Sequence, residues 1–548
     1  MQLSTFKRNE ILDDVNGEHF DIIIIGGGIT GAGIALDAAS RGMKVLLLEK
    51  YDFASGTSSK STKLIHGGLR YLKQMEFALV RKVGTERAVI HNLAPHLVVP
   101  INMLLPIYKK GSLGKYTTSL ALWIYDFLAK VKKEDQYKML GPKATKEIET
   151  LLNDEELIGG ALYKEYRTDD ARLTIEILKT AGSYGAICLN YAKAEEFIYS
   201  EEKISGIKFR DLISNKVFSS SAHKIINAAG PWVDDVRKLD ETIRGKQLHL
   251  TKGIHLVLAA QRLPISNAVY FDVDGDNRMI FAIPRNNKIY IGTTDTNYEG
   301  DKDNIGITKE DVGYLLNAVN QKFPSAKLIT EDIESSWAGL RPLIHEEGKS
   351  PSELSRKDEI FISQNGLISI AGGKLTGYRK MAEKVVDLLA ADLKKNNNLS
   401  FKKSDTSKIK INGSDFNSDI STYTERRTGE AKQIGLSYDD IKYLVNNYGT
   451  ATEWIIEKAF ELHGKIADAR ERILYAEILY CAEEEMITSL SDFLIRRTGR
   501  LYFDKSGVIK EYKLIEHLIE KILSTDPLTA QEQLMFFEYQ LQSAAEFK

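Results

Sequence analysis

The hydrophobic pattern near the start of the chain predicts a strand, a turn, a helix and a second strand. Residues 21–31, DIIIIGGGITG, carry four consecutive isoleucines that run into a glycine turn. An uninterrupted apolar run of this kind is typical of a parallel strand covered on both faces. Residues 31–41 predict a helix closed by Gly42, and residues 43–50, MKVLLLEK, predict the second strand. Together they have the length of one βαβ unit.

Further strand-like runs lie in the middle of the chain, separated by helical stretches. This alternation predicts the α/β class, with a cofactor domain and a mixed-sheet substrate domain threaded through it. The runs are KIINAAG (224–230), IHLVLAA (254–260), RMIFAIP (278–284), KIYIGTT (288–294) and LISIAGG (367–373).

The pattern divides the chain into three parts. Residues 15–395 carry the strand and helix alternation, and residues 396–409 are polar, rich in lysine and poor in apolar side chains, as in a linker. From residue 410 to residue 548 the periodicity is mostly helical, as in YDDIKYLVNNYG at 438–449. We therefore expect a large α/β region, a linker and a C-terminal α-helical domain.

Composition narrows the function classes. The 548 residues have a net charge of −2, which argues against a surface built for nucleic acid. The two cysteines, Cys188 and Cys481, allow no disulfide framework, so a reducing cytoplasm is the expected location. The first 20 residues contain no apolar signal core, and no run reaches 18 apolar residues. No metal is expected, because DVDGDN at 272–277 lacks the glycine and the terminal acid of a calcium loop.

A dinucleotide fingerprint follows the first strand. Gly26, Gly28 and Gly31 form G-x-G-x-x-G, in which the glycines permit a tight turn, backbone approach to a pyrophosphate and close packing of helix on strand. Glu49 ends the second strand, where a carboxylate can accept a hydrogen bond from a ribose hydroxyl, and Lys50 adjoins it. The fingerprint predicts dinucleotide binding but does not by itself separate FAD from NAD.

A second block, FASGTSSKSTKLIHGGLRYL at 53–72, offers further phosphate ligands. Thr57, Ser58 and Ser59 supply hydroxyl and N–H donors, and nearby lysines supply positive charge. Taken alone, the block suits a solvated, serine-rich helix start. With the fingerprint upstream, a second contact to the cofactor becomes the favoured interpretation.

With this block the sequence resembles the FAD-dependent (aerobic, quinone-linked) glycerol-3-phosphate dehydrogenases, within the wider glutathione-reductase-like and amino-acid-oxidase-like flavoproteins. The resemblance covers about residues 15–395, and the helical C-terminal part, with RRTGR at 496–500, resembles the family's cap domain less distinctively. One departure is Gly377, where the family's GGKLT-x-YR motif has a second threonine. The other matching motifs are INAAGPWVDD (226–235), KGIHLVL (252–258), YIGTTDT (290–296), GLRPL (339–343), Arg356 in LSRKDEI and GGKLTGYRKMAE (372–383).

The resemblance implies a Rossmann-like FAD-binding domain with an interleaved α+β substrate domain and a C-terminal helical cap. It also implies a set of cofactor-binding residues. They are Gly26, Gly28, Gly31, Glu49, Lys50, Thr57, Ser58, Ser59, Leu64, Ala194, Gly230, Trp232, Gly373, Lys374, Leu375 and Thr376.

The same resemblance implies a substrate site for a secondary alcohol that carries a phosphate. Of its residues, His255, Arg341 and Lys374 are the catalytic candidates, with His255 as general base and His66, Arg341 or water as the alternatives. The pKa of an unperturbed histidine, near 6.5, suits proton removal at neutral pH. Taken alone, a histidine on an apolar strand is more often a core residue, and an arginine in SRKDE is more often solvated. The implied substrate-binding residues are Arg70, Tyr71, His255, Arg341, Arg356 and Lys374.

Residues 101–133 mix leucines and aromatics with lysines at both ends, and they include Trp123, Tyr125 and Phe127. That composition is typical of an interfacial helix, although an ordinary amphipathic helix packed on the core has a similar one. Composition alone slightly favours the core helix, but the resemblance implies a membrane-associated family. We therefore expect a cytoplasmic protein bound peripherally to the inner face of the cell membrane.

The resemblance implies glycerol 3-phosphate as substrate and quinone as electron acceptor. The sequence leaves open an oxidase that reduces oxygen to hydrogen peroxide, an amine or amino-acid oxidase of the same group, and a flavin-binding scaffold. A homodimer is also possible, and no nucleic-acid partner is expected.

Overall fold

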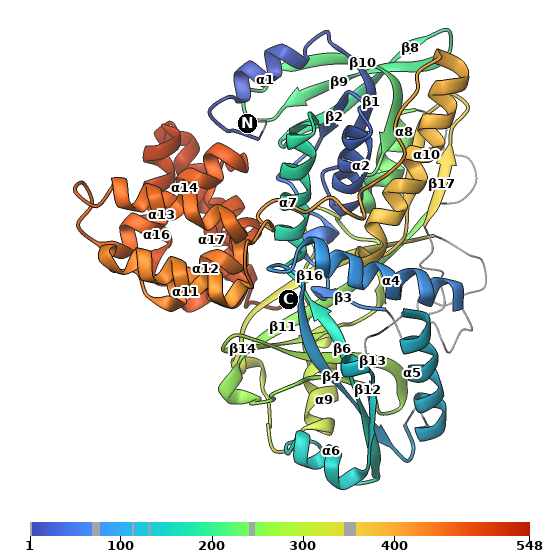
Figure 1. Ribbon diagram of the computed structural model, residues 1–548, viewed down its shortest axis with the longest axis vertical. Coiled ribbons are helices and arrows are strands. Elements are labelled where there is room, and N and C mark those ends of the chain that lie inside the picture. The colour runs from blue at the N-terminus through green and yellow to red at the C-terminus, as the bar shows by residue number, and fades with distance from the viewer. Residues whose placement is uncertain are drawn as a thin grey trace.

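The computed structural model describes residues 3–67, 77–111, 114–129, 131, 133–240, 247–344 and 358–548. Two β-sheets with their helices form the upper and lower parts of the molecule in Figure 1, and a bundle of helices from the C-terminal part of the chain lies at their side. The mixed α/β architecture that the sequence predicts is therefore confirmed.

The first sheet has eight strands in the order β17-β18-β10-β1-β2-β7, with β9 added to β10 and β8 to β9. Its central pairs are parallel, while β17, β8 and β9 run antiparallel to their neighbours. The strands are β1 (His19–Ile25), β2 (Val45–Leu48), β7 (Ile187–Leu189), β8 (Ala192–Ser200), β9 (Lys203–Asp211), β10 (Val217–Asn227), β17 (Glu359–Ile362) and β18 (Ile368–Ala371).

The predicted βαβ unit forms the centre of this sheet. Ile22–Ile25 are all buried, because β1 pairs with β2 on one side and β10 on the other while helices cover the sheet. Helix α2 (Ile29–Ser40) packs against both α7 (Asp170–Ser183) and α10 (Tyr378–Asn397). The four isoleucines thus predicted both the strand and its burial.

The second sheet has ten strands in the order β15-β11-β14-β13-β12-β4-β6-β3, with β16 added to β11 and β5 to β6. Of the five mid-chain runs that the sequence predicts as strands, three lie in β11, β13 and β14 of this sheet. The other two lie in the first sheet, KIINAAG at the end of β10 and LISIAGG in β18. The strands are β3 (Leu64–Ile65), β4 (Val99–Tyr108), β5 (Lys138–Leu140), β6 (Leu157–Arg167), β11 (Leu248–Ala259), β12 (Ala268–Val273), β13 (Asp276–Arg285), β14 (Lys288–Gly292), β15 (Thr296–Asn297) and β16 (Ile333–Ile344).

The expectation of one interfacial helix over residues 101–133 is wrong for its first part. Val99–Tyr108 form strand β4, whose Leu104 and Leu105 are buried because β4 lies between β12 and β6. The helix of this stretch is α5 (Lys115–Ala129). The lysines and aromatics therefore belong to two elements with different surroundings.

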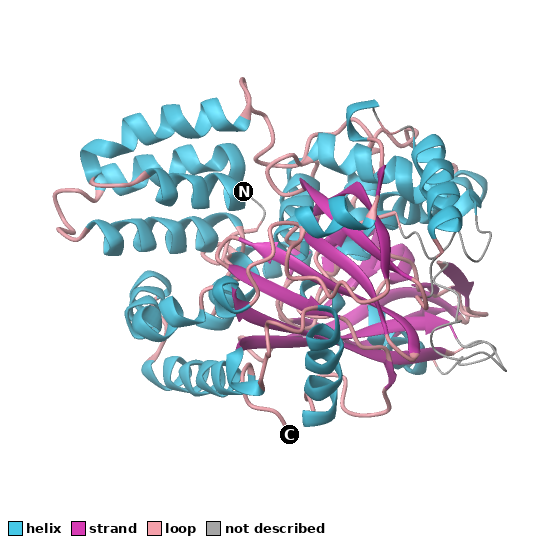
Figure 2. Ribbon diagram, turned by 90° about the horizontal axis from the view of Figure 1, so that it is seen from below, coloured by secondary structure: helices cyan, strands magenta, loops and turns pink. Residues whose placement is uncertain are grey.

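The helices that begin at residue 420 or later form the separate bundle that Figure 2 shows beside the strands. The helices not yet given are α1 (Arg8–Val15), α4 (Phe77–Leu93), α6 (Pro142–Ile148), α8 (Val233–Leu239), α9 (Lys309–Lys322), α11 (Ile420–Ala431), α12 (Tyr438–Tyr448), α13 (Thr452–Glu461), α14 (Ala469–Glu484), α15 (Arg500–Phe503), α16 (Lys505–Leu523) and α17 (Pro527–Ser543).

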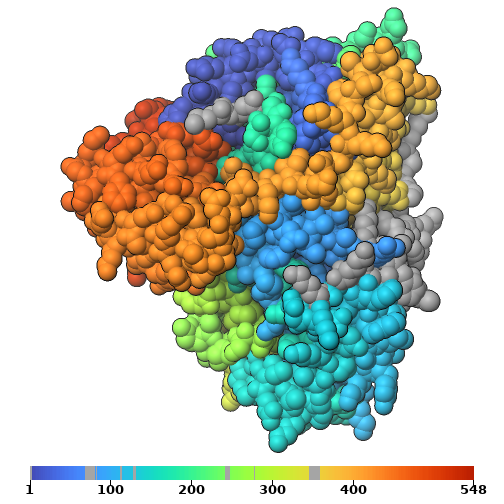
Figure 3. Space-filling view, viewed as in Figure 1, coloured from blue at the N-terminus to red at the C-terminus, as the bar shows by residue number. Residues whose placement is uncertain are grey.

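The polar segment between α10 and α11 crosses the surface toward the bundle (Figure 3). It is tied down by backbone hydrogen bonds, from Lys402 N to Arg41 O at 3.3 Å and from Ile411 N to Leu93 O at 3.0 Å. Its lysines and serines therefore follow the surface of the first sheet and its helices, called the first unit below; the second sheet and its helices are the second unit.

Buried ion pairs join the bundle to the first sheet unit. Arg497, in the RRTGR stretch, donates to Asp52 at 2.6 and 2.9 Å, and Arg496 donates to the same carboxylate. Although burial alone would raise it, these two guanidinium groups lower the pKa of Asp52 to about 2. Because Asp52 follows β2 directly, the C-terminal bundle holds the segment that leads into the predicted cofactor site.

Candidate functional site: two adjoining cavities

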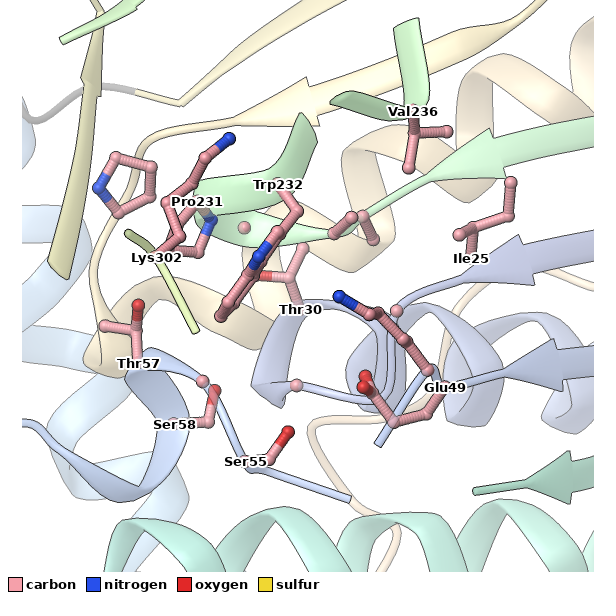
Figure 4. A pocket seen from close by; sticks show the side chains of 18 of the residues that line it. Ile25, Thr30, Glu49, Ser55, Thr57, Ser58, Pro231, Trp232, Val236 and Lys302 are labelled. Atoms are coloured by element: carbon pink, nitrogen blue, oxygen red, sulfur yellow. The ribbon is translucent and has the colours of Figure 1, made fainter. Parts of the chain in front are cut away.

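A cavity of about 600 Å³ lies at the carboxyl ends of β1, β2, β10 and β18. In open parallel sheets this edge, where the strand order reverses, is where ligands bind. Figure 4 shows Glu49, Ser55, Thr57 and Ser58 on one side of the cavity, with Pro231, Trp232 and Lys302 on the other. The cavity is therefore assembled from segments that lie far apart in the sequence.

The glycine turn shapes the cavity floor as the fingerprint predicts. Gly26 has φ +114°, and a side chain there would meet the carbonyl oxygen of Ala228 at 2.6 Å. A Cβ on Gly31 would lie 1.9 Å from the carbonyl oxygen of Gly26, so only glycine lets α2 approach β1 this closely. Gly26 and Gly28 line the cavity, whereas Gly31 supports it from within the helix.

Glu49 lines the cavity and braces the turn at the same time. Its Oε2 accepts a hydrogen bond from Gly27 N at 2.6 Å, and its Oε1 accepts one from Tyr51 N at 2.9 Å. Burial raises the pKa of this carboxyl above its ordinary value, against the opposing effect of the two N–H donors. The remaining lone pairs can still receive a ribose hydroxyl.

The hydroxyl-rich block has divided roles. Ser58 Oγ accepts a hydrogen bond from Ile29 N at 2.9 Å, so it caps the first turn of α2 beside the cavity. Thr57 also lines the cavity and donates to Leu340 O at 2.7 Å. Ser59 is different, because it is buried and lines neither of the two cavities described here. The structure thus brings two of the three predicted hydroxyls to the cavity.

The rest of the wall comes from later motifs. Ala194, Gly230, Trp232, Gly373 and Leu375 all line the cavity, and Lys50 and Lys374 do so as well. Gly230 and Gly373 have φ +53° and +84°, a conformation that favours glycine where the backbone approaches a ligand. Leu64 and Thr376 line a second, smaller cavity instead.

Sequence reasoning missed one wall of the large cavity. Gly300–Asp303, which follow β15 in the second sheet unit, line it together with Asp235 of α8. The alternating charges of YEGDKDN were the available signal, but a short charged loop usually indicates only a solvated turn.

The second cavity, of about 140 Å³, adjoins the first. Thr57, Ser61, Gly373, Lys374 and Leu375 line both. The small cavity also receives the predicted His255 and Arg341, together with the second candidate base, His66. A molecule held there would lie beside whatever occupies the near end of the large cavity.

His255 is a buried, neutral imidazole. Its Nε2 lies 3.0 Å from Thr62 Oγ1, its ring stacks on Trp337 at 4.8 Å, and its Nδ1 has no hydrogen-bond partner among the described residues. Burial, and then the charges of Arg341 and Lys63, lower the pKa of His255 well below 6.5. The neighbouring arginine thus favours the neutral form, and the ring is in its proton-accepting form throughout the neutral range.

Arg341 is fixed at the edge of the small cavity. It donates to Thr293 Oγ1 at 2.7 Å and to Thr294 O at 3.1 Å, and it pairs with Asp295 at 3.2 Å. Gly253 leaves room for the guanidinium, since a Cβ there would lie 2.2 Å from Nη2. The arginine is therefore pre-oriented, and Asp295 offsets part of its charge.

The remaining predicted substrate residues divide into two groups. Lys374 lines both cavities, at the point where they meet. Arg70, Tyr71 and Arg356 lie outside the described residues, so their predicted roles stay predictions.

Known families match both parts of the chain. A model described as FAD dependent oxidoreductase matches residues 21–379, which makes FAD-dependent oxidoreductases the class to which fold and site belong. A model described as the C-terminal domain of alpha-glycerophosphate oxidase matches residues 404–527.

Similar proteins narrow this class. An aerobic glycerol-3-phosphate dehydrogenase of Staphylococcus haemolyticus is 49% identical over 98% of this chain and 96% of its own length. One from Staphylococcus aureus is 47% identical over 96% of this chain and 95% of its own. The chain belongs to the FAD-dependent oxidoreductases and, among them, to the family of the aerobic glycerol-3-phosphate dehydrogenases.

Solved structures agree with this assignment. The glycerol-3-phosphate dehydrogenase of Bacillus halodurans complexed with FAD has a TM-score of 0.85 and 40% identity, and the match covers 99% of both chains. The L-alpha-glycerophosphate oxidase of Mycoplasma pneumoniae, with a TM-score of 0.55 and 18% identity over 71% of this chain and 97% of its own, shows the shared fold alone.

The residues of the large cavity fit FAD. The backbone turn at Gly26–Gly28 and the N-terminus of α2 suit a pyrophosphate, because the turn lines the cavity and the positive end of the helix dipole faces the same space. The glycines at 372 and 373 leave room for a flat ring system at the other end, next to the small cavity. The chain is FAD-dependent, and this cavity is the place that fits the cofactor.

Proposed function

We propose that the protein oxidises sn-glycerol 3-phosphate to dihydroxyacetone phosphate. The observation that carries this proposal is the small cavity in which His255, Arg341 and Lys374 meet at the near end of the cofactor cavity. A phosphate calls for fixed cations, and a hydroxyl that is to be oxidised calls for a proton acceptor. The names of the similar proteins support the same substrate.

In the proposed reaction the protein binds, orients and removes a proton. FAD bound in the large cavity would supply the two-electron chemistry, as acceptor of the hydride lost from C2 of the substrate at flavin N5. Arg341 and Lys374 hold the phosphate, with Arg341 oriented by Thr293 and Asp295. His255 takes the hydroxyl proton at an imidazole nitrogen, directly or through Thr62, which lies at hydrogen-bond distance from Nε2. Loss of one hydride and one proton leaves the ketone.

We propose that the electrons then pass to quinone and that the protein binds the membrane peripherally through α5. Tyr116, Leu120, Trp123 and Phe127 are 89%, 58%, 57% and 71% exposed, and their spacing places them along one face of the helix. Leu122 and Tyr125 of the same helix are buried. Such an unpartnered aromatic face suits the lipid interface.

No helix within the described part of the chain is long and apolar enough to cross a bilayer. The proposed attachment is therefore interfacial, at the inner face of the cell membrane. The second candidate is an oxidase that passes electrons to oxygen, which the C-terminal family match favours. The homodimer stays a prediction.

Two experiments test the function. Anaerobic addition of glycerol 3-phosphate should bleach the yellow colour of the holoprotein, and no bleaching would contradict the proposed substrate. The acceptor is then tested by adding quinone or oxygen to the reduced protein. Rapid reoxidation by oxygen alone, with hydrogen peroxide formed, would replace the dehydrogenase by the oxidase.

Membrane binding is tested with vesicles that contain anionic lipid. Trp123→Glu/Phe127→Glu should lose most of its co-sedimentation, because two apolar side chains that would enter the interface become charged. Leu528→Glu/Phe536→Glu is the matched control, since those side chains of α17 are 68% and 58% exposed on a different region. Equal loss in both variants, or in neither, would exclude α5 as the attachment surface.

A further inference from the structure

A short segment of the second sheet unit reaches across to the first unit at the cofactor cavity. Residues 298–303, called the strap here, follow β15, and Gly300–Asp303 line the cavity. The strap is braced internally, because Tyr298 donates to Asp301 O at 2.6 Å and Asp303 N donates to Asp301 Oδ1 at 2.9 Å. It therefore has a defined shape at the cavity wall.

Two ion pairs of opposite polarity fasten the strap to the first unit. Lys50 of the first unit pairs with Asp303 of the strap at 3.1 Å, and Lys302 of the strap pairs with Asp235 of the first unit. Neighbouring residues 302 and 303 thus bind to two different walls of the cavity. All four residues line the cavity.

The positions of the two anchors place the strap over the glycine turn. Lys50 follows the end of β2, and Asp235 lies in α8, which follows β10. In the sheet, β1 lies between β2 and β10, and the Gly26–Gly28 turn continues from its end. A segment fastened to both anchors thus spans the end of β1, where the backbone suits the pyrophosphate.

We propose that the strap closes the cofactor cavity and that its two ion pairs slow the release of FAD. The glycine turn and the neighbouring backbone form the inner wall of the cofactor cavity, and the strap forms its outer wall. FAD leaves only when the strap moves, and movement of the strap separates both charge pairs. Lys50, predicted from the sequence as a cofactor ligand, acts in this proposal mainly as an anchor for Asp303.

The size and salt dependence of the effect follow from the exposure of the pairs. The four side chains are between 24% and 41% exposed, so each pair contributes modestly and is screened by salt. Reversing the charge of Lys302 removes one attraction and adds a repulsion with Asp235. We expect release of FAD to become about fivefold to tenfold faster at low ionic strength.

The experiment follows FAD release from the holoprotein after dilution, by the rise in fluorescence of the freed flavin, at low and at high salt. Wild type should release FAD faster as salt increases. Lys302→Glu should release it rapidly at low salt and lose this acceleration. Asp235→Lys/Lys302→Glu, which restores a pair of reversed polarity, should return release toward the wild-type rate.

Lys238→Glu is the matched control. Lys238 also pairs with Asp235, at 3.6 Å, but it lies on α8 and does not belong to the strap. Its reversal should leave the release rate within about twofold of wild type, as for an exposed pair. The proposal is overturned if Lys302→Glu releases FAD at the wild-type rate, or if Lys238→Glu accelerates release as much as Lys302→Glu does. It is also overturned if Asp235→Lys/Lys302→Glu releases FAD as fast as Lys302→Glu alone. None of these readings depends on the substrate or on the electron acceptor.

Discussion

The two adjoining cavities are lined by different kinds of groups, mainly backbone in one and side chains in the other. The large one takes most of its shape from backbone and glycines: the turn at Gly26–Gly28, the paired glycines before Lys374, and small side chains such as Ala194. The small one is shaped by side chains that carry charge or hydrogen bonds, among them His255 and Arg341, each fixed by a partner from another segment.

The difference shows how each cavity would tolerate change. A Cβ added at Gly26 or Gly31 would collide with a backbone carbonyl oxygen. Side-chain positions lose one interaction at a time, and the surrounding fold remains. Substitutions at Gly26 or Gly31 should therefore remove the cofactor as a whole, whereas substitutions in the small cavity should alter rates.

Gly31→Val should give the largest effect. Its Cβ would lie 1.9 Å from the carbonyl oxygen of Gly26, so the turn must open and the protein should purify with little or no FAD. The flavin-to-protein absorbance ratio measures this. Gly313→Ala is the control, since a Cβ there meets nothing within 4 Å and full flavin content is expected. Full occupancy in Gly31→Val would mean that the glycine turn does not hold the cofactor.

His255→Ala should keep its flavin but slow flavin reduction by about 10²–10⁴-fold, the usual range for a lost general base. Stopped-flow absorbance under anaerobic conditions measures the rate. His249→Ala, on the same strand but only half-buried and bonded to Asn297, is the control and should react like wild type.

The pH profile sharpens the assignment of His255. Its pKa lies well below 6.5, so the neutral, accepting form is complete at pH 6.5. Between about pH 8 and pH 6.5 the wild-type rate of flavin reduction should show no loss from protonation of this residue. A fall with a midpoint near 6.5 would assign the base to a group other than His255.

Arg341→Ala should lower kcat/KM by about tenfold to 150-fold, the loss of roughly 1.5–3 kcal/mol for a charge-assisted contact. Flavin content should not change, because Arg341 lines only the small cavity. Steady-state kinetics with glycerol 3-phosphate gives the first quantity and absorbance the second. Unchanged kinetics would remove Arg341 from the substrate site.

Lys374→Ala should lower kcat/KM by about tenfold, within the same range for one lost charge-assisted contact. Because Lys374 lines both cavities, this variant should also hold FAD less tightly, which separates it from Arg341→Ala. Titration of the apoprotein with FAD measures the difference. Equal FAD affinity in the two variants would place Lys374 in the small cavity alone.

The sequence by itself determined the elements that rest on local pattern. The isoleucine run, the glycine triplet and the acid at Glu49 lie within one βαβ unit, so their order along the chain already fixes their arrangement in space. The resemblance added the motifs around Gly230 and Gly373, and the structure brings them to the same cavity.

Only the tertiary structure decided the features that depend on distant segments. It divided residues 101–133 between a core strand and an exposed helix, which composition alone could not do because apolar side chains serve both. It buried His255 against Trp337 and beside Arg341, and burial is the main cause of its lowered pKa. It also carried Lys302 and Asp303 of the second unit to the cofactor cavity of the first. Burial and charge pairing depend on which surfaces meet across the fold, and that information is absent from the local periodicity of the chain.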